Sequence, residues 1–255
     1  MVWRAAVARA ALGALLLLAL LAAPARAQTQ PLVADLSKHL VAITTGFSGT
    51  DVLLFGATDG PGDIVLVVRG PPGREVVRRK DRAGIIWVNA DSVDFEDVPA
   101  FYWLATSRPL DEFANPAVLE RHQIGTGNLR LPVADFAEIP PQTRTDFARA
   151  LVRLKTAEGL YGEEQGVVRQ LANRLFRAEL HFPSNVPVGT YMVEVYLIRE
   201  GEVVSAEITP LIISKVGVGA DIYDFAHNQP ALYGIAAIIV AVAAGWLAGV
   251  AFRKS

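Results

Sequence analysis

The sequence predicts a mainly β fold: an immunoglobulin-like β-sandwich with a helical insertion near residues 111–174, followed by one C-terminal transmembrane helix. Three observations lead to this prediction. Residues 176–182 and 191–197 alternate apolar and polar side chains, as strands do when one face is buried. Residues 147–154 instead carry apolar side chains at helical spacing. Residues 231–252 form an uncharged apolar run that is long enough to cross a bilayer.

The first 27 residues have the features of a cleaved secretory signal peptide. Arg4 and Arg9 form a basic region, residues 10–23 form an apolar core, and Ala25-Arg26-Ala27 is an A-x-A cleavage site. An uncleaved N-terminal anchor is the alternative, and the shortness of the apolar core argues against it. The predicted organisation is a signal peptide at 1–27, a periplasmic domain at 28–229, a transmembrane helix at 230–252 and a cytoplasmic stub at 253–255.

Composition restricts the function of the exported domain. The domain contains all 26 acidic residues of the chain and 19 of its 24 basic residues, which gives a net charge of −7. An acidic domain argues against binding to nucleic acid and against broad binding to an anionic membrane surface. The complete lack of cysteine excludes disulfides, cysteine-ligated zinc and iron–sulfur clusters.

Strands dominate the first half of the domain. Leu40–Thr45 and Val52–Ala57 flank the turn Gly46-Phe47-Ser48-Gly49, which suits a hairpin. Ile64–Val68 is a continuous β-branched run, which predicts a strand buried on both faces. Two further apolar runs, which also read as strands, are Ile85–Val88 and Phe101–Ala105.

Helices are predicted next. Asn115-Pro116 can open a short helix that extends through His122. Thr143 with Asp146 resembles a capping box at the start of a longer helix, which Gly159 ends. A second amphipathic stretch covers roughly Glu163–Arg174.

Strands return after residue 175. Glu200-Gly201 turns the chain from the strand at 191–197 into another strand at Val203–Ile213. The stretch from Pro187 to Tyr191 is similar to the entry of a late strand in immunoglobulin-like sandwiches, where a tyrosine braces a corner.

The C-terminal apolar run predicts a single membrane span. Asn228 and Gln229 can cap its start, Pro230 suits the first helical position, and the basic pair at 253–254 predicts a cytoplasmic C-terminus. Small residues recur every fourth position and could let another helix approach closely, although an alanine-rich span produces such ladders by chance. These predicted helix-packing residues are Ala237, Ala241, Gly245 and Gly249.

A basic cluster is the main candidate binding site of the exported domain. Its members could bind a small anion such as sulfite or a lipid phosphate, and a solvated hairpin with protective charges is the alternative. They are Arg69, Arg74, Arg78, Arg79, Lys80 and Arg82. The acidic residues between 91 and 97 do not have the spacing of a calcium loop, so a hydrophilic loop is the simpler interpretation. No nucleophile elbow or nucleotide-binding motif is present, so the sequence predicts no enzyme, no catalytic residue, no cofactor and no metal site.

The chain resembles the alphaproteobacterial "putative transmembrane protein" family. The resemblance lies in the stretches TTGFSGTDVLLFGA, DIVLVVRGP, NVPVGTYMVEVYLIREG and IYDFAHNQPALYGIAA. Members of that family often accompany sulfite-exporter-like permeases, so the resemblance implies such a permease as a partner and implies no catalytic residues. The expected function is that of a membrane-anchored periplasmic accessory protein that contacts a membrane protein, or itself, through its span. A periplasmic small-anion-binding module is the alternative, and a hydrolase is a third, weaker one.

Overall fold

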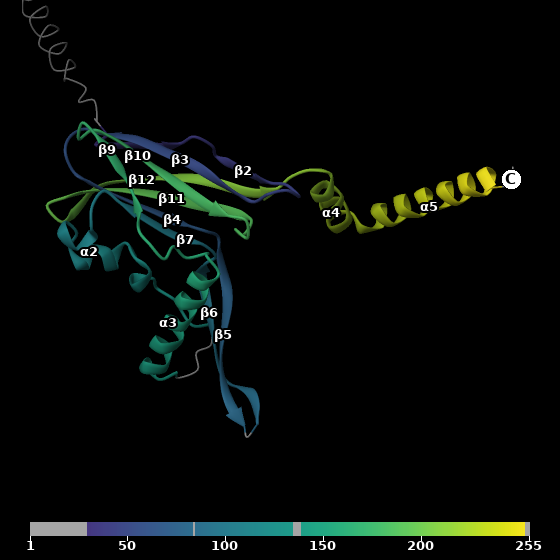
Figure 1. Ribbon diagram of the computed structural model, residues 1–255, viewed down its shortest axis with the longest axis horizontal. Helices are drawn as coiled ribbons and strands as arrows, with labels where there is room; N and C mark the ends of the chain where they lie inside the picture. Colours follow the sequence, from purple (N-terminus) through teal and green to yellow (C-terminus); the bar gives the residue numbers. More distant parts are fainter. Residues whose placement is uncertain (1–29, 84, 135–138, 253–255) are drawn as a thin grey trace, which may run out of the picture. The chain divides into compact units, whose positions relative to one another are not determined.

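The computed structural model describes residues 30–83, 85–134 and 139–252 (Figure 1). The predicted signal peptide and the predicted cytoplasmic stub lie outside the described residues. The described part of the chain is mainly β with one C-terminal apolar helix, and its sheets form a sandwich-like arrangement, so the predicted fold class is confirmed.

Two sheets form the sandwich. The four-stranded sheet has the order β1 (Leu32–Leu36), β3 (Gly49–Thr58), β10 (Leu175–Pro183) and β9 (Arg169–Leu171). The six-stranded sheet has the order β2 (Leu40–Ile43), β12 (Glu202–Lys215), β11 (Gly189–Arg199), β4 (Asp63–Arg69), β7 (Tyr102–Thr106) and β8 (Gly166–Val167). A separate two-stranded hairpin consists of β5 (Pro72–Ala83) and β6 (Ile86–Pro99).

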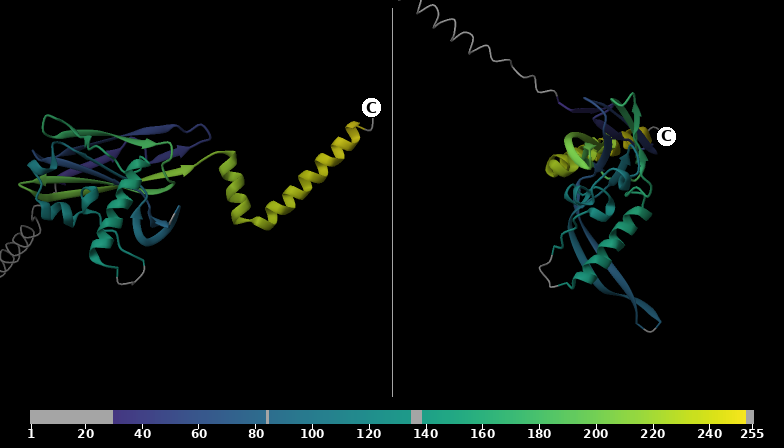
Figure 2. Two further views of the ribbon diagram at one scale, coloured as in Figure 1. Left: turned by 60° about the horizontal axis from the view of Figure 1, so that its bottom comes forward. Right: turned by 90° about the vertical axis from the view of Figure 1, so that its left-hand side faces the viewer.

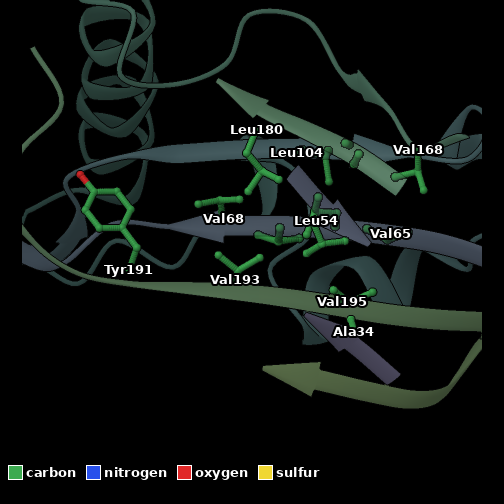
Figure 3. Packing of buried hydrophobic residues seen from close by; sticks show 14 of the residues in the cluster. Ala34, Leu54, Val65, Val68, Leu104, Val168, Leu180, Tyr191, Val193 and Val195 are labelled. Carbon is green, nitrogen blue, oxygen red and sulfur yellow. The ribbon is translucent and has the colours of Figure 1, made fainter. Parts of the chain in front are cut away.

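The main hydrophobic core lies between the two sheets. Figure 3 shows Leu180 of β10 and Val68 of β4 within this core, and both side chains are buried. All five residues from Ile64 to Val68 are fully buried, as the continuous apolar run predicts. Strand β4 is covered on both faces because the helical insertion lies over the side of its sheet that faces away from the core.

The predicted tyrosine corner is present. The Tyr191 hydroxyl donates a hydrogen bond to the carbonyl oxygen of Pro187 at 2.6 Å. The Tyr191 ring is fully buried at one end of the core, as Figure 3 shows. It contacts the rings of Phe101 and Phe182, with centroids 5.8 Å apart in each case. The corner therefore fixes the start of β11 against the core.

The helical insertion contains two short 3-10 helices and two α-helices. In chain order they are η1 (Leu110–Glu112), α2 (Pro116–Arg121), η2 (Thr126–Asn128) and α3 (Pro141–Ala157). The Asn115 side chain caps α2 by accepting a hydrogen bond from the backbone N–H of Ala117 at 3.0 Å, as predicted. Gly159 follows α3 with a φ of 73°, a left-handed conformation that suits glycine and ends the helix.

Three sequence predictions about local structure are wrong. Residues 40–57 do not form a hairpin, because β2 pairs with β12 in one sheet while β3 pairs with β1 and β10 in the other. The expected capping box fails because α3 begins at Pro141, which places Thr143 inside the first turn. The stretch Glu163–Arg174 contains the short strands β8 and β9 instead of a helix.

The two errors that concern strands share a cause. Periodicity indicates that a segment is a strand or a helix, but it does not indicate which distant segment provides the hydrogen bonds. Strand β8 exists because its two residues pair in parallel with Ala105 and Thr106 of β7, more than fifty positions earlier in the chain. Strand β6 is likewise longer than the apolar run at 85–88, because β5 pairs with its polar part as well.

Two helices follow the sandwich. Helix α4 (Val218–Asn228), which the sequence analysis did not predict, stacks Tyr223 on His227 with ring centroids 3.9 Å apart. Helix α5 (Pro230–Phe252) is an apolar helix of 23 residues that is long enough to cross a membrane. None of its most apolar part is buried against the rest of the described chain.

Candidate interaction surfaces

An exposed apolar strip runs along the outer face of β12. Alternate residues of β12, at positions 204, 206, 208, 210 and 212, are all apolar and all exposed. Leu40 of β2 lies opposite Ile212, and Met192 of β11 lies opposite Pro210, so both extend the same face. We call the five large members the β12 strip: Leu40 (51% exposed), Met192 (40%), Val204 (46%), Ile208 (51%) and Ile212 (49%).

The neighbouring part of the same sheet face is covered. The segment between α2 and η2 lies over β4, β7 and β11, and it holds Arg69 through the backbone carbonyls of His122 and Gln123 at 2.7 and 3.2 Å. Glu194 on β11 points to this covered side and is buried, although its register partner Ile208 is half exposed. The β12 strip is therefore the part of the outer face that the insertion leaves open.

A buried polar network fastens the insertion to the sheet. Arg69 Nη1 forms an ion pair with Glu194 at 2.6 Å, and the Tyr196 hydroxyl donates to the same carboxylate at 2.7 Å. The Tyr102 hydroxyl donates to the Gln123 carbonyl at 3.1 Å and accepts from the Gly125 N–H at 2.7 Å. Burial raises the pKa of Tyr102 to about 12 and also raises the pKa of Tyr196, so both hydroxyls stay protonated at neutral pH.

The β5–β6 hairpin has a packed base. Helix α3 covers this base, as the contacts between α3 and β5 indicate and as Figure 2 shows. A second, smaller hydrophobic cluster forms there from Val77, Val93, Phe95, Val98, Phe147 and Leu151. The buried ammonium of Lys155 on α3 pairs with Glu75 of β5 at 2.5 Å. The base is thus held by both apolar packing and an ion pair.

The outer part of the same hairpin touches α3 at Arg79, whose guanidinium lies 5.8 Å from the centroid of the Phe147 ring, and its tip lies beyond this contact. We define the outer hairpin as residues 78–92, and all of its side chains that the structure describes are exposed. Its large apolar members are residues 85–88, which end the turn and begin β6, and of these Ile85 is 93% exposed and Trp87 is 67% exposed. Its basic members are Arg78, Arg79, Lys80 and Arg82.

The structure divides the predicted basic cluster between two places. Arg69 belongs to the six-stranded sheet and is paired with Glu194, whereas the other five residues lie on β5. On β5, Arg74 pairs with Asp94 and Arg79 pairs with Asp91 across the hairpin. The Arg74 hydrogen bond lowers the pKa of Asp94. These acidic residues are strand positions with basic partners, and no group of three metal-ligating residues occurs among the residues that the structure describes.

The predicted helix-packing residues lie on α5. Positions 237, 241, 245 and 249 each advance about 40° around a helix of 3.6 residues per turn, so they share one side of α5. A Cβ atom added at Gly245 or Gly249 would meet no other atom within 4 Å. This side of α5 is open for contact with another helix, and such contact remains a prediction.

Comparison with known proteins gives one match. A family model described as "Putative transmembrane protein (Alph_Pro_TM)" matches residues 31–254. The chain belongs to this family. The match confirms the family that the sequence stretches indicated, and its description agrees with the apolar helix α5. No curated protein and no solved structure matches the chain.

Sequence reasoning missed both exposed surfaces. It interpreted residues 203–213 and 85–88 only as strands, because apolar character in a strand normally indicates burial. A usable signal was present in β12, where five consecutive alternate positions are apolar while the intervening positions include Ser205, Glu207 and Thr209. The exposed side of that strand is the more uniformly apolar one, which makes it a candidate contact surface.

Proposed function

We propose that this family member is a membrane-anchored periplasmic accessory protein, and that it docks on an inner-membrane protein through the β12 strip. The observation that carries the proposal is a connected row of exposed apolar side chains on β2, β11 and β12, in the strand that leads toward α4 and α5. Exposed apolar patches of this kind are typical of protein interaction sites. A sulfite-exporter-like permease is the partner that the family resemblance suggests.

The proposed topology places residues 28–229 in the periplasm and the C-terminus in the cytoplasm. Its support is the A-x-A site after residue 24, the apolar helix α5 and the basic pair at 253–254. The chain has no cysteine, so single cysteines report position cleanly. An impermeant thiol reagent applied to spheroplasts should label Glu179→Cys and not Ser255→Cys, and the reverse pattern would contradict the topology.

The position of the β12 strip along the chain supports docking near the membrane. Strand β12 ends at Lys215 and leads through α4 into α5, so the Ile212 end of the strip lies about 18 positions before the span. A partner that is itself embedded in the bilayer could contact the strip and the small-residue side of α5 together. Two linked contacts strengthen each other, because binding at one raises the local concentration at the other.

Photo-crosslinking in intact cells tests the docking surface. A photoreactive amino acid at Ile208 should crosslink to a polytopic inner-membrane protein, which mass spectrometry of the adduct identifies. The matched control is Glu179, which is also exposed on an outer face but belongs to the other sheet. Ile208→Asp should abolish co-purification of that protein in mild detergent. Equal crosslinking from positions 208 and 179, or none from 208, would refute the proposal.

A further inference from the structure

The outer hairpin combines features that a free surface loop does not need. Ile85, Ile86, Trp87 and Val88 are all exposed, although four apolar residues in succession are costly to leave in water. A two-stranded hairpin with neither face covered is also only marginally stable in water. The outer hairpin therefore has the composition of a segment that is covered by something outside the chain.

The charge of this segment identifies what covers it. The outer hairpin, residues 78–92, contains four basic and two acidic residues and has a net charge of +2, whereas the exported domain as a whole has a net charge of −7. Arg82 lies opposite Trp87 and Lys80 lies opposite Asn89, so basic and aromatic side chains share one face of the hairpin. Tryptophan with basic neighbours is typical of segments at the boundary between lipid headgroups and acyl chains.

We call residues 70–71 and 100–101, where the hairpin leaves the sandwich, the root of the hairpin. This root lies at the end of the sandwich from which the chain continues to the membrane helix α5. Arg69 at the end of β4 pairs with Met192, and Gly189 of the adjacent strand pairs with Ile213 near the end of β12. A Cβ atom at Gly189 would meet Pro71 at 2.7 Å, so the hairpin root contacts this end of the sheet. Strand β12 continues from here toward α4 and α5.

The root is also fixed in direction. The backbone N–H of Gly70 donates to the Phe101 carbonyl at 2.8 Å, and the N–H of Ala100 donates to the Pro71 carbonyl at 2.9 Å. Phe101 in turn packs against the tyrosine corner at Tyr191. The hairpin is therefore braced where it leaves the sandwich, and α3 braces its base.

The hairpin is long enough to reach a bilayer. Twelve residues of β5 extend about 36 Å at 3.3 Å per residue, and about 20 Å of this lies beyond Val77 at the packed base. Helix α4 spans about 16 Å, and Val216, Gly217 and Gln229 add at most about 10 Å between β12 and α5. The full length of the hairpin, which starts at the same end of the sandwich, exceeds this sum.

We propose that the tip of the β5–β6 hairpin binds the anionic surface of the bilayer in which α5 is anchored. Ile85, Ile86 and Trp87 enter the headgroup region, and Arg78, Lys80 and Arg82 contact lipid phosphates. The acidic remainder of the domain is repelled by the same surface. This second attachment fixes how the sandwich, and with it the β12 strip, is presented above the membrane.

The test uses the mature full-length chain reconstituted in lipid nanodiscs. Ile85→Cys carries the only thiol, which is labelled with an environment-sensitive fluorophore. In discs that contain phosphatidylglycerol, the label should shift to shorter wavelength and be quenched by lipids with a spin label near the headgroup. In discs of phosphatidylcholine alone, or at high salt, the quenching should decrease, because the attraction is electrostatic.

Two controls make the result decisive. A label at Glu179→Cys, on the other sheet, should remain unquenched in both kinds of disc. The triple change Arg78→Ser, Lys80→Ser and Arg82→Ser should abolish the quenching at position 85. The matched triple change Arg169→Ser, Arg174→Ser and Arg177→Ser removes the same charge from exposed positions near the opposite end of the sandwich and should leave the quenching unchanged.

Two outcomes would overturn the proposal. A label at position 85 that is equally solvent-exposed in anionic and neutral discs shows that the hairpin does not contact lipid. A label that becomes shielded only after a copurified membrane protein is added shows that the hairpin binds protein. The first outcome is measured with the chain alone in the nanodisc, so it does not depend on whether the β12 strip docks on a partner. In the second arm, Ile208→Asp in the labelled chain removes docking through the β12 strip, so shielding that persists reports contact by the hairpin itself.

Discussion

Strands β11 and β12 are hydrogen-bonded neighbours, yet their outer faces have opposite environments. Glu194 of β11 is charged and buried, and its register partner Ile208 of β12 is apolar and half exposed. The difference arises because the helical insertion covers Glu194 and Tyr196 of β11, whereas Ile208 of β12 lies outside the covered area. A charged residue is buried there because Arg69 and Tyr196 satisfy its carboxylate, while apolar residues remain uncovered next to it. Burial in this sheet is therefore set by the inserted segment, and the uncovered apolar row is available to a partner.

The largest loss of stability should come from a substitution on the inner face of β11. Tyr191→Ala removes a fully buried ring together with its hydroxyl bond, and it should lower the free energy of unfolding by about 3–5 kcal/mol. Tyr191→Phe keeps the ring and should cost only about 1 kcal/mol. Chemical denaturation of both variants measures the two values. An unchanged free energy of unfolding in Tyr191→Ala would show that the corner does not hold β11 in the core.

Removing the charge under the insertion should have the next largest effect. Glu194→Ala leaves Arg69 without its carboxylate partner in a largely enclosed site, which should cost about 3 kcal/mol. Glu194→Gln keeps hydrogen-bonding atoms in place and should cost less. Hydrogen exchange should show that amides between residues 116 and 128 lose protection in Glu194→Ala, because the network fastens that segment. Unchanged exchange in this segment would show that the ion pair does not hold the insertion on the sheet.

Alkaline pH should lower the free energy of unfolding, because four buried tyrosines must then lose their protons. Burial raises the pKa of Tyr102 to about 12 and raises those of Tyr161, Tyr191 and Tyr196 above the ordinary value of 10.0. Above pH 10 the unfolded chain releases these protons while the folded chain retains them, so stability present below pH 10 is lost as pH rises. The loss should be on the order of 1 kcal/mol per pH unit for each tyrosine. Denaturation at pH 8 and pH 11 measures it, and equal stability at both would contradict burial of these hydroxyls.

The sequence allowed the fold class and many single elements to be predicted, and it failed on pairing between distant segments. The period-two pattern of β10, the two-sided burial of β4 and the tyrosine corner follow from residues that are close in sequence. The separation of β2 from β3 into different sheets depends on partners that local patterns do not specify. The candidate basic cluster shows the same limit, because no residue near Arg69 in the sequence indicates that its guanidinium forms an ion pair with Glu194.

The smallest effect on stability should come from a substitution in the β12 strip. Such a substitution separates the role of the strip in binding from any role in folding. Ile208 is half exposed, so Ile208→Ser removes little buried surface and should change the free energy of unfolding by only about 0.5 kcal/mol. If the strip is a docking surface, the same change should strongly reduce recovery of a partner from mild detergent. Leu154→Ser is the matched control, since Leu154 is a half-exposed apolar residue of α3 outside the strip. Stability falling by several kcal/mol in Ile208→Ser would show that this side chain belongs to the core. Equal recovery from Ile208→Ser, Leu154→Ser and the unaltered chain would show that an apolar strand face can stay open without serving a partner.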